Sequence, residues 1–145
     1  MDVLLWCMLR KLKKILLIDD DETQLILAKA ILKSNYTITS VKSGREALEH
    51  LYKGLTPDLI LLDILMPNMD GWEVFNRIKA ISNLHEVPIV FLTSMNMPAD
   101  INRAHEMGAV DFITKPYDRA DLVKRIKKAI SIKEKNKKES SQKGL

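Results

Sequence analysis

Four short apolar runs in this chain end in residue types that can do chemistry. The first run is followed by Asp19, Asp20 and Asp21, the third by Asp63, the fourth by Thr93 and Ser94, and the fifth by Thr114, Lys115 and Pro116. One polar residue after an apolar run is ordinary, because every strand must enter a loop. Carboxylates, a hydroxyl and an ammonium at four such places indicate that these side chains share a site.

The carboxylates predict a binding site for a hard divalent cation. Poorly solvated carboxylates that converge from two strands repel one another, and a cation offsets that repulsion. Mg²⁺ takes oxygen ligands, keeps several waters and commonly completes its shell with a phosphate oxygen. Lys115 would then neutralise a phosphate oxygen, the Thr93 hydroxyl would donate to another, and a carboxylate would serve as nucleophile. The combination indicates phosphoryl chemistry.

The elements that must position these groups alternate regularly. Apolar runs of four to six residues, typical of strands buried on both faces, occupy 15–18, 36–41, 59–62, 87–92 and 110–113. Each run precedes apolar residues at helical spacing, such as Leu25, Ala28, Ile31 and Leu32 after the first. This alternation predicts an α/β fold with a doubly wound parallel sheet, since parallel neighbours need crossover helices. Ligands of such sheets bind beyond the C-terminal ends of the strands.

Length and composition predict one domain. The 145 residues are 46% hydrophobic and 29% charged, and a chain of this length buries enough surface to fold without disulfides or a structural metal. The single cysteine, Cys7, excludes an internal disulfide, and no Cys/His cluster indicates zinc. We therefore expect a reducing, cytoplasmic setting.

The net charge of +4 belongs to the two ends of the chain. Residues 1–14 carry four cations and one anion, and residues 133–145 carry five cations and two anions, so each end is +3 and residues 15–132 are −2. The stretch from Lys133 to Lys143 has no apolar periodicity. We expect 133–145 to be a basic, disordered tail and predict no direct DNA binding.

An apolar run of seven residues, Val3 to Leu9, precedes the first strand. It is too short to span a membrane, which takes about 20 residues, so we predict no membrane span. Asp2 comes before it and cations follow it, the reverse of the charge order in a signal peptide. We expect 1–13 to be an N-terminal extension: either a short helix packed on the body or on a partner, or a start that is not native, with Met8 as another possible start.

The order and spacing of four segments form a pattern that is typical of a known family. The segments are Ile15 to Asp20, Leu59 to Gly71, Leu92 to Ser94 and Thr114 to Pro116. Together they resemble the receiver domain of two-component response regulators, of the single-domain, chemotaxis-receiver-like kind. The resemblance implies a receiver domain over 14–132 with a five-stranded, flavodoxin-like (βα)5 fold and strand order 2-1-3-4-5.

The resemblance also implies a role for each acidic residue. Asp63 would be the phosphoacceptor, taking its phosphoryl group from a sensor histidine kinase or a histidine phosphotransfer protein. Asp20, Asp63 and the main-chain carbonyl of Leu65 would bind Mg²⁺ directly, and Asp19 would act through water. Asp21 departs from the family pattern, and its position before Glu22 predicts a helix N-cap.

Further roles implied by the resemblance concern the other two strand ends. Thr93 and Lys115 would hold the phosphoryl oxygens. Phe112 would be the switch aromatic, turning inward when Thr93 moves, and Lys115-Pro116 would be a cis peptide bond. Two positions that vary in the family, Leu65 and Met95, are apolar here, and we expect them to exclude water and give a long-lived phosphoryl group.

Two alternatives remain open. The string Asp19-x-Asp21-x-Thr23 also matches the opening motif of haloacid-dehalogenase-type phosphatases, in which Asp19 would be the nucleophile, although the later acidic pair and cap insertion are lacking. The chain could instead be the receiver part of a larger regulator or a hybrid kinase.

A receiver would not be an enzyme beyond its own phosphorylation and dephosphorylation. It would act on a downstream protein through a surface that changes on phosphorylation. The resemblance assigns that surface to the fourth helix, fifth strand and fifth helix of the receiver domain, near residues 101–107, 110–113 and 122–130, where a homodimer could also form.

Overall fold

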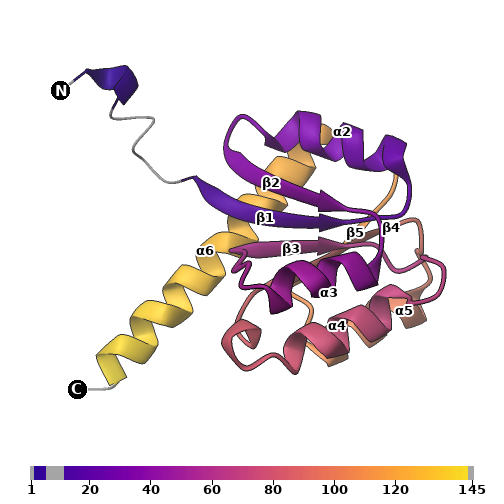
Figure 1. Ribbon diagram of the computed structural model, residues 1–145. Helices are drawn as coiled ribbons and strands as arrows, with labels where there is room; N and C mark the ends of the chain where they lie inside the picture. The colour runs from indigo at the N-terminus through magenta and orange to yellow at the C-terminus, as the bar shows by residue number, and fades with distance from the viewer. Residues whose placement is uncertain (1, 6–11, 144–145) are drawn as a thin grey trace.

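The computed structural model describes residues 2–5 and 12–143. Its centre is a sheet of five parallel strands in the order β2-β1-β3-β4-β5, as Figure 1 shows. The strands are β1 (Lys13–Ile18), β2 (Tyr36–Val41), β3 (Leu59–Leu62), β4 (Ile89–Thr93) and β5 (Asp111–Thr114). The predicted fold class and strand order are confirmed.

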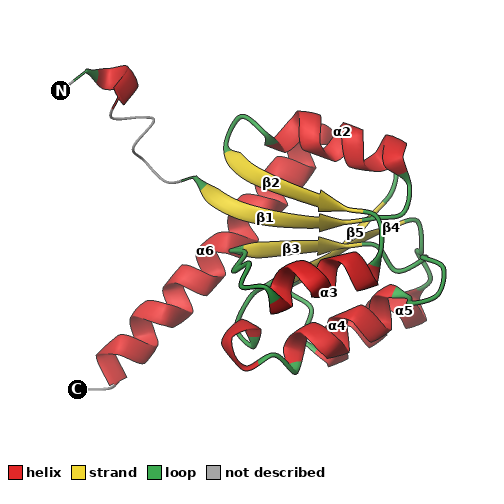
Figure 2. Cartoon of the chain, in the orientation of Figure 1, coloured by secondary structure: helices red, strands yellow, loops and turns green. Residues whose placement is uncertain are grey.

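Helices cover both faces of the sheet (Figure 2). They are α2 (Glu22–Leu32), α3 (Gly44–Tyr52), α4 (Gly71–Lys79), α5 (Pro98–Met107) and α6 (Arg119–Lys143), with a 3₁₀ turn at Ser82–Leu84. One core cluster joins the sheet to α3, α4 and α5, and a second joins it to α2 and α6. The three central strands are buried on both faces, which explains their unbroken apolar runs.

Strand register aligns the C-terminal ends of the strands. Ile18 lies opposite Leu62 across β1 and β3, and Thr93 lies opposite Thr114 across β4 and β5. The residues that follow these positions therefore emerge along one edge of the sheet, as the sequence predicts.

The described first residues of the N-terminal extension, 2–5, are exposed and do not pack on the body. Residues 3–5 form one helical turn whose side chains are exposed, with 74% of Val3 and 72% of Leu4 accessible. The expectation of a short helix packed on the body is therefore wrong for these residues; the rest of the run, including Cys7 and Met8, lies outside the described residues. Within the described chain, no helix is both long enough and apolar enough to cross a membrane.

The C-terminal stretch differs from the expected disordered tail. Helix α6 continues from its packed part, which includes Leu122, Ile126 and Ala129, to Lys143. The absence of apolar periodicity excludes burial but not helix, because Lys, Glu and Gln are good helix formers. Extending an existing helix also avoids the cost of nucleation. The division of the chain at residue 132 remains a prediction.

Candidate functional site

Three carboxylates converge at the C-terminal edge of the sheet. Asp19 and Asp20 follow β1, and Asp63 follows β3. One carboxylate oxygen from each lies within 4.8 Å of the others. Asp19 and Asp63 are buried, whereas Asp20 is exposed at the mouth of the site. The predicted acidic cluster is therefore present.

Lys115 brings the counter-charge from the end of β5. Its Nζ lies 2.5 Å from Oδ2 of Asp19 and 3.7 Å from Oδ2 of Asp63. The main-chain N–H of Lys115 donates to the carbonyl of Thr93, which ties the two strand ends together. The Lys115-Pro116 bond is cis, as the resemblance implies. The ammonium is thus shared between two carboxylates and lies closer to Asp19.

Two further groups border the Asp63 carboxylate. The main-chain N–H of Ile64 donates to its Oδ1 at 2.7 Å. Thr93 is fully buried, and its Oγ1 accepts a long hydrogen bond, 3.4 Å, from the N–H of Met95. The structure therefore surrounds Asp63 with a main-chain donor, an ammonium and a hydroxyl.

Electrostatics at Asp63 reflect a balance between burial and these partners. Burial raises the pKa of Asp63, and the neighbouring carboxylate of Asp19 raises it further. Lys115, the Thr93 hydroxyl and the N–H of Ile64 lower the pKa, but burial prevails. The ionised site is therefore short of positive charge, and a cation would relieve the deficit.

The donor set fits a hard cation. Besides the three carboxylates, the carbonyl of Leu65 accepts no hydrogen bond from any described residue, so it is available as a ligand. The site opens into a cavity of about 490 Å³ lined by eight residues, including Asp20, Asp63 and Lys115. Oxygen ligands with an open side suit Mg²⁺, which retains water and binds phosphate.

The loop after Asp63 is held by the start of α4. The N–H of Gly71 donates to the carbonyl of Ile64 at 2.9 Å, and Asp70 caps α4 by accepting from the N–H of Glu73. A Cβ atom on Gly71 would overlap the carbonyl oxygen of Asp63 and lie 2.6 Å from Cα of Ile64. Glycine is required here by this close approach rather than by its backbone angles.

Aromatic side chains extend from the site toward the α4 and α5 face. The Phe112 ring is half-buried and lies 6.1 Å from the Phe91 ring, which lies 5.1 Å from the Trp72 ring. The Arg103 guanidinium lies 4.3 Å from the centre of the Trp72 ring. The switch role of Phe112 stays a prediction, but its ring is in contact range of a continuous aromatic path.

Three remaining predictions from the sequence concern Asp21, Leu65 and Met95. Asp21 is the N-cap of α2, accepting from the N–H groups of Thr23 and Gln24, and is confirmed. Leu65 is half-exposed and lines the Asp63 cavity. Met95 lies beside Leu65 in a smaller neighbouring cavity instead.

Sequence reasoning missed two groups near the site. The sequence gives no signal for the main-chain N–H of Ile64, because every residue except proline has a main-chain N–H. Tyr117 directly follows Lys115-Pro116, and its hydroxyl is a buried polar atom that has no hydrogen-bond partner among the described residues. Burial and the charge of Asp19 raise the pKa of Tyr117, and a polar aromatic after Lys-Pro was the signal that could have identified it.

A doubly wound parallel sheet in the order 2-1-3-4-5, with its site at the C-terminal ends of the strands, defines the flavodoxin-like class of ligand-binding domains. Comparison with known proteins narrows this class. A family model, the response regulator receiver domain, matches residues 15–127.

Two curated relatives from Oryza sativa subsp. japonica are named two-component response regulators. ORR6 is 40% identical over 111 residues, covering 74% of this chain and 65% of that protein. ORR7 is 37% identical over 109 residues, covering 74% of this chain and 52% of that protein. The chain thus spans about half to two thirds of their length.

Solved structures agree with the family model. A signal receiver domain of a histidine kinase from Syntrophus aciditrophicus has a TM-score of 0.74 and 38% identity, with 82% of this chain and 90% of that chain covered. The chemotaxis protein CheY4 of Vibrio cholerae has a TM-score of 0.76 and 27% identity, with 81% and 98% covered. This chain belongs to the response regulator receiver domain family, whose members are phosphoacceptors in two-component signalling.

Proposed function

We propose that Asp63 is the phosphoacceptor of this receiver and that Thr93 and Lys115 hold the transferred phosphoryl group. The observation that carries this proposal is the position of the Asp63 carboxylate, which borders an open cavity while its oxygens are bound by Ile64 and approached by Lys115. The donor is a sensor histidine kinase or a histidine phosphotransfer protein.

The transfer exchanges one bond to phosphorus for another. A carboxylate oxygen of Asp63 forms the new O–P bond while the N–P bond of the donor's phosphohistidine breaks, and the imidazole keeps the electron pair. Lys115 moves from Asp19 toward the phosphoryl oxygens and neutralises their charge, and the Thr93 hydroxyl donates to another oxygen. These residues position and stabilise charge, which is most of what catalysis of phosphoryl transfer requires.

The cation that fits the site is Mg²⁺, which Asp20, Asp63 and the carbonyl of Leu65 would hold, with Asp19 acting through water. When bound, Mg²⁺ neutralises the carboxylates and orients a phosphoryl oxygen. The Leu65 carbonyl, which accepts no hydrogen bond within the described part of the chain, and the raised pKa of Asp63 support this assignment.

The output of the domain is a changed surface rather than catalysis on another substrate. The surface formed by α5, β5 and α6 is proposed to contact a downstream protein or a second copy of the chain. There, Arg125 bridges Asp111 of β5 and Asp121 of α6, both at 3.0 Å. Localisation in the cytoplasm follows from the reducing setting expected for this sequence.

Acetyl phosphate tests the assignment directly. We expect the chain incubated with acetyl phosphate and Mg²⁺ to gain one acid-labile phosphoryl group by intact mass, and Asp63→Asn to gain none. Full labelling of Asp63→Asn would contradict the assignment of Asp63. Continuous hydrolysis of acetyl phosphate by the Asp63→Asn variant, together with loss of that hydrolysis in Asp19→Asn, would favour the phosphatase alternative, with Asp19 as nucleophile.

A further inference from the structure

The exposed face of α6 carries a row of five lysines. Lys124, Lys127, Lys128, Lys135 and Lys138 are all exposed. Lys124, Lys128, Ser131, Lys135 and Lys138 follow one another at steps of three and four residues, and Lys127 lies three residues after Lys124 and four before Ser131. This spacing places them along one side of a helix. We call these five residues the lysine stripe.

No described acidic side chain forms an ion pair with the lysine stripe. The described ion pairs of α6 use Arg125 and Glu134 instead. Glu139, four residues after Lys135, lies at the margin of the stripe. The apolar side of α6, which includes Ile126 and Ala129, packs against the sheet. The stripe therefore presents a surface of one charge sign to solvent, and it suits a partner with many negative charges.

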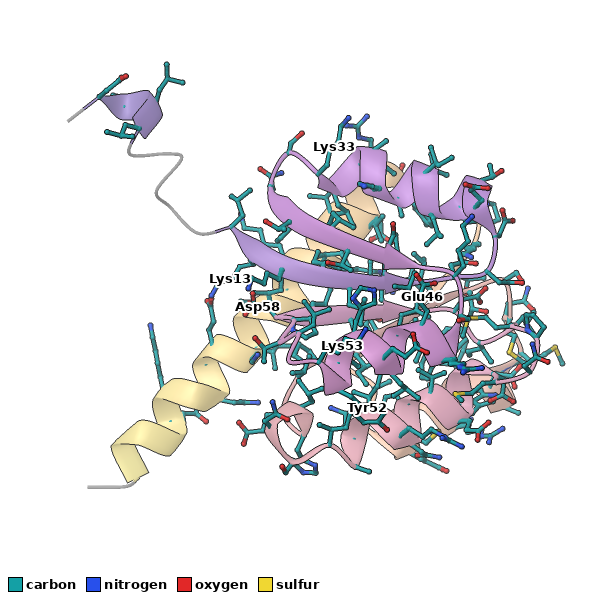
Figure 3. The ribbon with its side chains drawn as sticks, in the orientation of Figure 1. Lys13, Lys33, Glu46, Tyr52, Lys53 and Asp58 are labelled. Atoms are coloured by element: carbon teal, nitrogen blue, oxygen red, sulfur yellow. The ribbon has the colours of Figure 1, made fainter. Side chains whose placement is uncertain are left out.

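The N-terminal extension enters the body beside this helix. Lys13, at the start of β1, forms an ion pair with Glu134 of α6 at 3.0 Å, and Figure 3 shows Lys13 next to α6. The residue before it, Leu12, is 44% exposed. Val3 and Leu4 are mostly exposed, and Leu5 is about half exposed. Leu12 and the C-terminal part of the lysine stripe, Lys135 and Lys138, thus lie near the same end of the sheet.

This end lies opposite the candidate phosphorylation site. In Figure 1 the turn at residues 3–5 and the last turns of α6 both lie on the side where the strands begin. Asp63 lies at the side where they end. A large partner bound at the first side would leave the cavity at Asp63 open to a kinase.

We propose that the C-terminal part of the lysine stripe and the exposed apolar side chains of residues 3–5 and Leu12 together bind the surface of an anionic lipid membrane. A polybasic surface attracts acidic headgroups, but stable binding to a membrane needs a second, apolar contribution. The stripe supplies the first, and the side chains of residues 3–5 and Leu12 supply the second. Three successive apolar side chains, those of residues 3–5, are exposed, and exposed apolar side chains in a group mark an interaction site. A phosphate backbone of nucleic acid would use the lysines alone.

The binding mode is peripheral. From Lys133 to Lys143 the helix has no apolar residue, so α6 lies against the headgroups and does not enter the hydrocarbon region. The domain would be held with Asp63 directed away from the bilayer.

Sedimentation with vesicles tests the proposal. We expect the full chain to bind vesicles of equal parts phosphatidylcholine and phosphatidylglycerol, and not phosphatidylcholine alone, with affinity falling as salt is raised. Lys135→Gln/Lys138→Gln is expected to weaken binding about 25-fold, since each lysine at an anionic surface contributes about fivefold. The matched control, Lys29→Gln/Lys33→Gln, removes the same charge from two exposed lysines at the end of α2, one in its last turn and one at its C-cap, and is expected to bind as the parent does.

A second pair of variants tests the apolar contribution. Leu4→Ser/Leu5→Ser is expected to weaken vesicle binding about tenfold or more, while the control Ile26→Ser/Leu27→Ser changes two exposed apolar residues of α2 without effect. Circular dichroism checks that each variant is folded. Absence of vesicle binding by the parent, or equal losses in variants and controls, would overturn the proposal. If the parent does not bind vesicles, and if parent and Leu4→Ser/Leu5→Ser bind duplex DNA equally well, the lysine stripe is a nucleic-acid-binding surface instead.

Discussion

Gly71 touches the main chain of Asp63, so that the first residue of α4 sets the position of the candidate phosphoacceptor. A methyl group on Gly71 would overlap the carbonyl of Asp63. The two residues are further joined through Ile64, whose carbonyl accepts from Gly71 and whose N–H donates to the Asp63 carboxylate. The helix start, the loop and the carboxylate are therefore held together by direct contacts.

Gly71→Ala is expected to lower the free energy of unfolding by about 1–3 kcal/mol, the usual cost of overpacking, and to slow labelling of Asp63. Urea denaturation and intact mass after acetyl phosphate measure the two effects. Gly108→Ala is the control, because Gly108 has a positive φ of 99° with open space around it. It should lose stability without slowing labelling, and equal slowing in both variants would contradict the link between Gly71 and Asp63.

Asp20→Ala is expected to lose Mg²⁺-dependent labelling while remaining folded. Without Asp20, only two of the three proposed direct ligands remain, Asp63 and the Leu65 carbonyl. Two protein ligands are too few to bind firmly a cation that dehydrates reluctantly. Labelling rates across a series of Mg²⁺ concentrations measure this. The exposed position of Asp20 predicts little change in folding, and an unchanged Mg²⁺ dependence would remove Asp20 from the ligand set.

Leu65→Asn/Met95→Glu is expected to shorten the lifetime of the phosphoryl group about tenfold, since about 1.4 kcal/mol of better water positioning is enough. Neither parent side chain offers a strong hydrogen bond to a hydrolytic water. Because Leu65 lines the Asp63 cavity and Met95 lies beside it, the single variant Leu65→Asn should account for most of the effect. The decay of labelled protein by intact mass gives the lifetime, and equal decay in parent and double variant would show that these side chains do not set it.

Tyr117→Phe is expected to raise the free energy of unfolding by about 1 kcal/mol. The Tyr117 hydroxyl is buried without a partner among the described residues, and a buried hydroxyl without a hydrogen bond costs about 1–3 kcal/mol. Thermal and urea denaturation measure the change. A clear loss of stability in Tyr117→Phe would show that the hydroxyl is bonded, for example to an internal water.

Alkaline pH is expected to destabilise the fold through Tyr36. Burial raises the pKa of Tyr36 above its ordinary value of 10.0, so above that pH the unfolded chain releases the phenol proton before the folded chain does. The folded state then binds more protons, and the free energy of unfolding falls as pH rises through the pKa of the folded state. Urea denaturation over this range should show a smaller fall in Tyr36→Phe, with Tyr52→Phe, which alters a side chain that is 66% exposed, as control.

Sequence alone was sufficient for the parts of this protein that depend on local pattern. Apolar runs with helical stretches between them predicted the five strands, and the parallel sheet followed because crossover helices force parallel neighbours. The same topology sends residues after different strands to one edge, so the grouping of Asp19, Asp63 and Lys115 could be predicted before any distance was known.

Only the tertiary structure decided how the chain shares its charges and contacts. Three features depend on contacts between residues apart in sequence or on side-chain orientation, which sequence pattern does not encode. They are the choice of carboxylate that holds Lys115, the close approach of Gly71 to Asp63, and the burial of the Tyr117 hydroxyl without a partner among the described residues. The course of α6 to Lys143 was also mispredicted. Apolar spacing reports burial, whereas a helix that already packs at one end can continue in water on propensity alone.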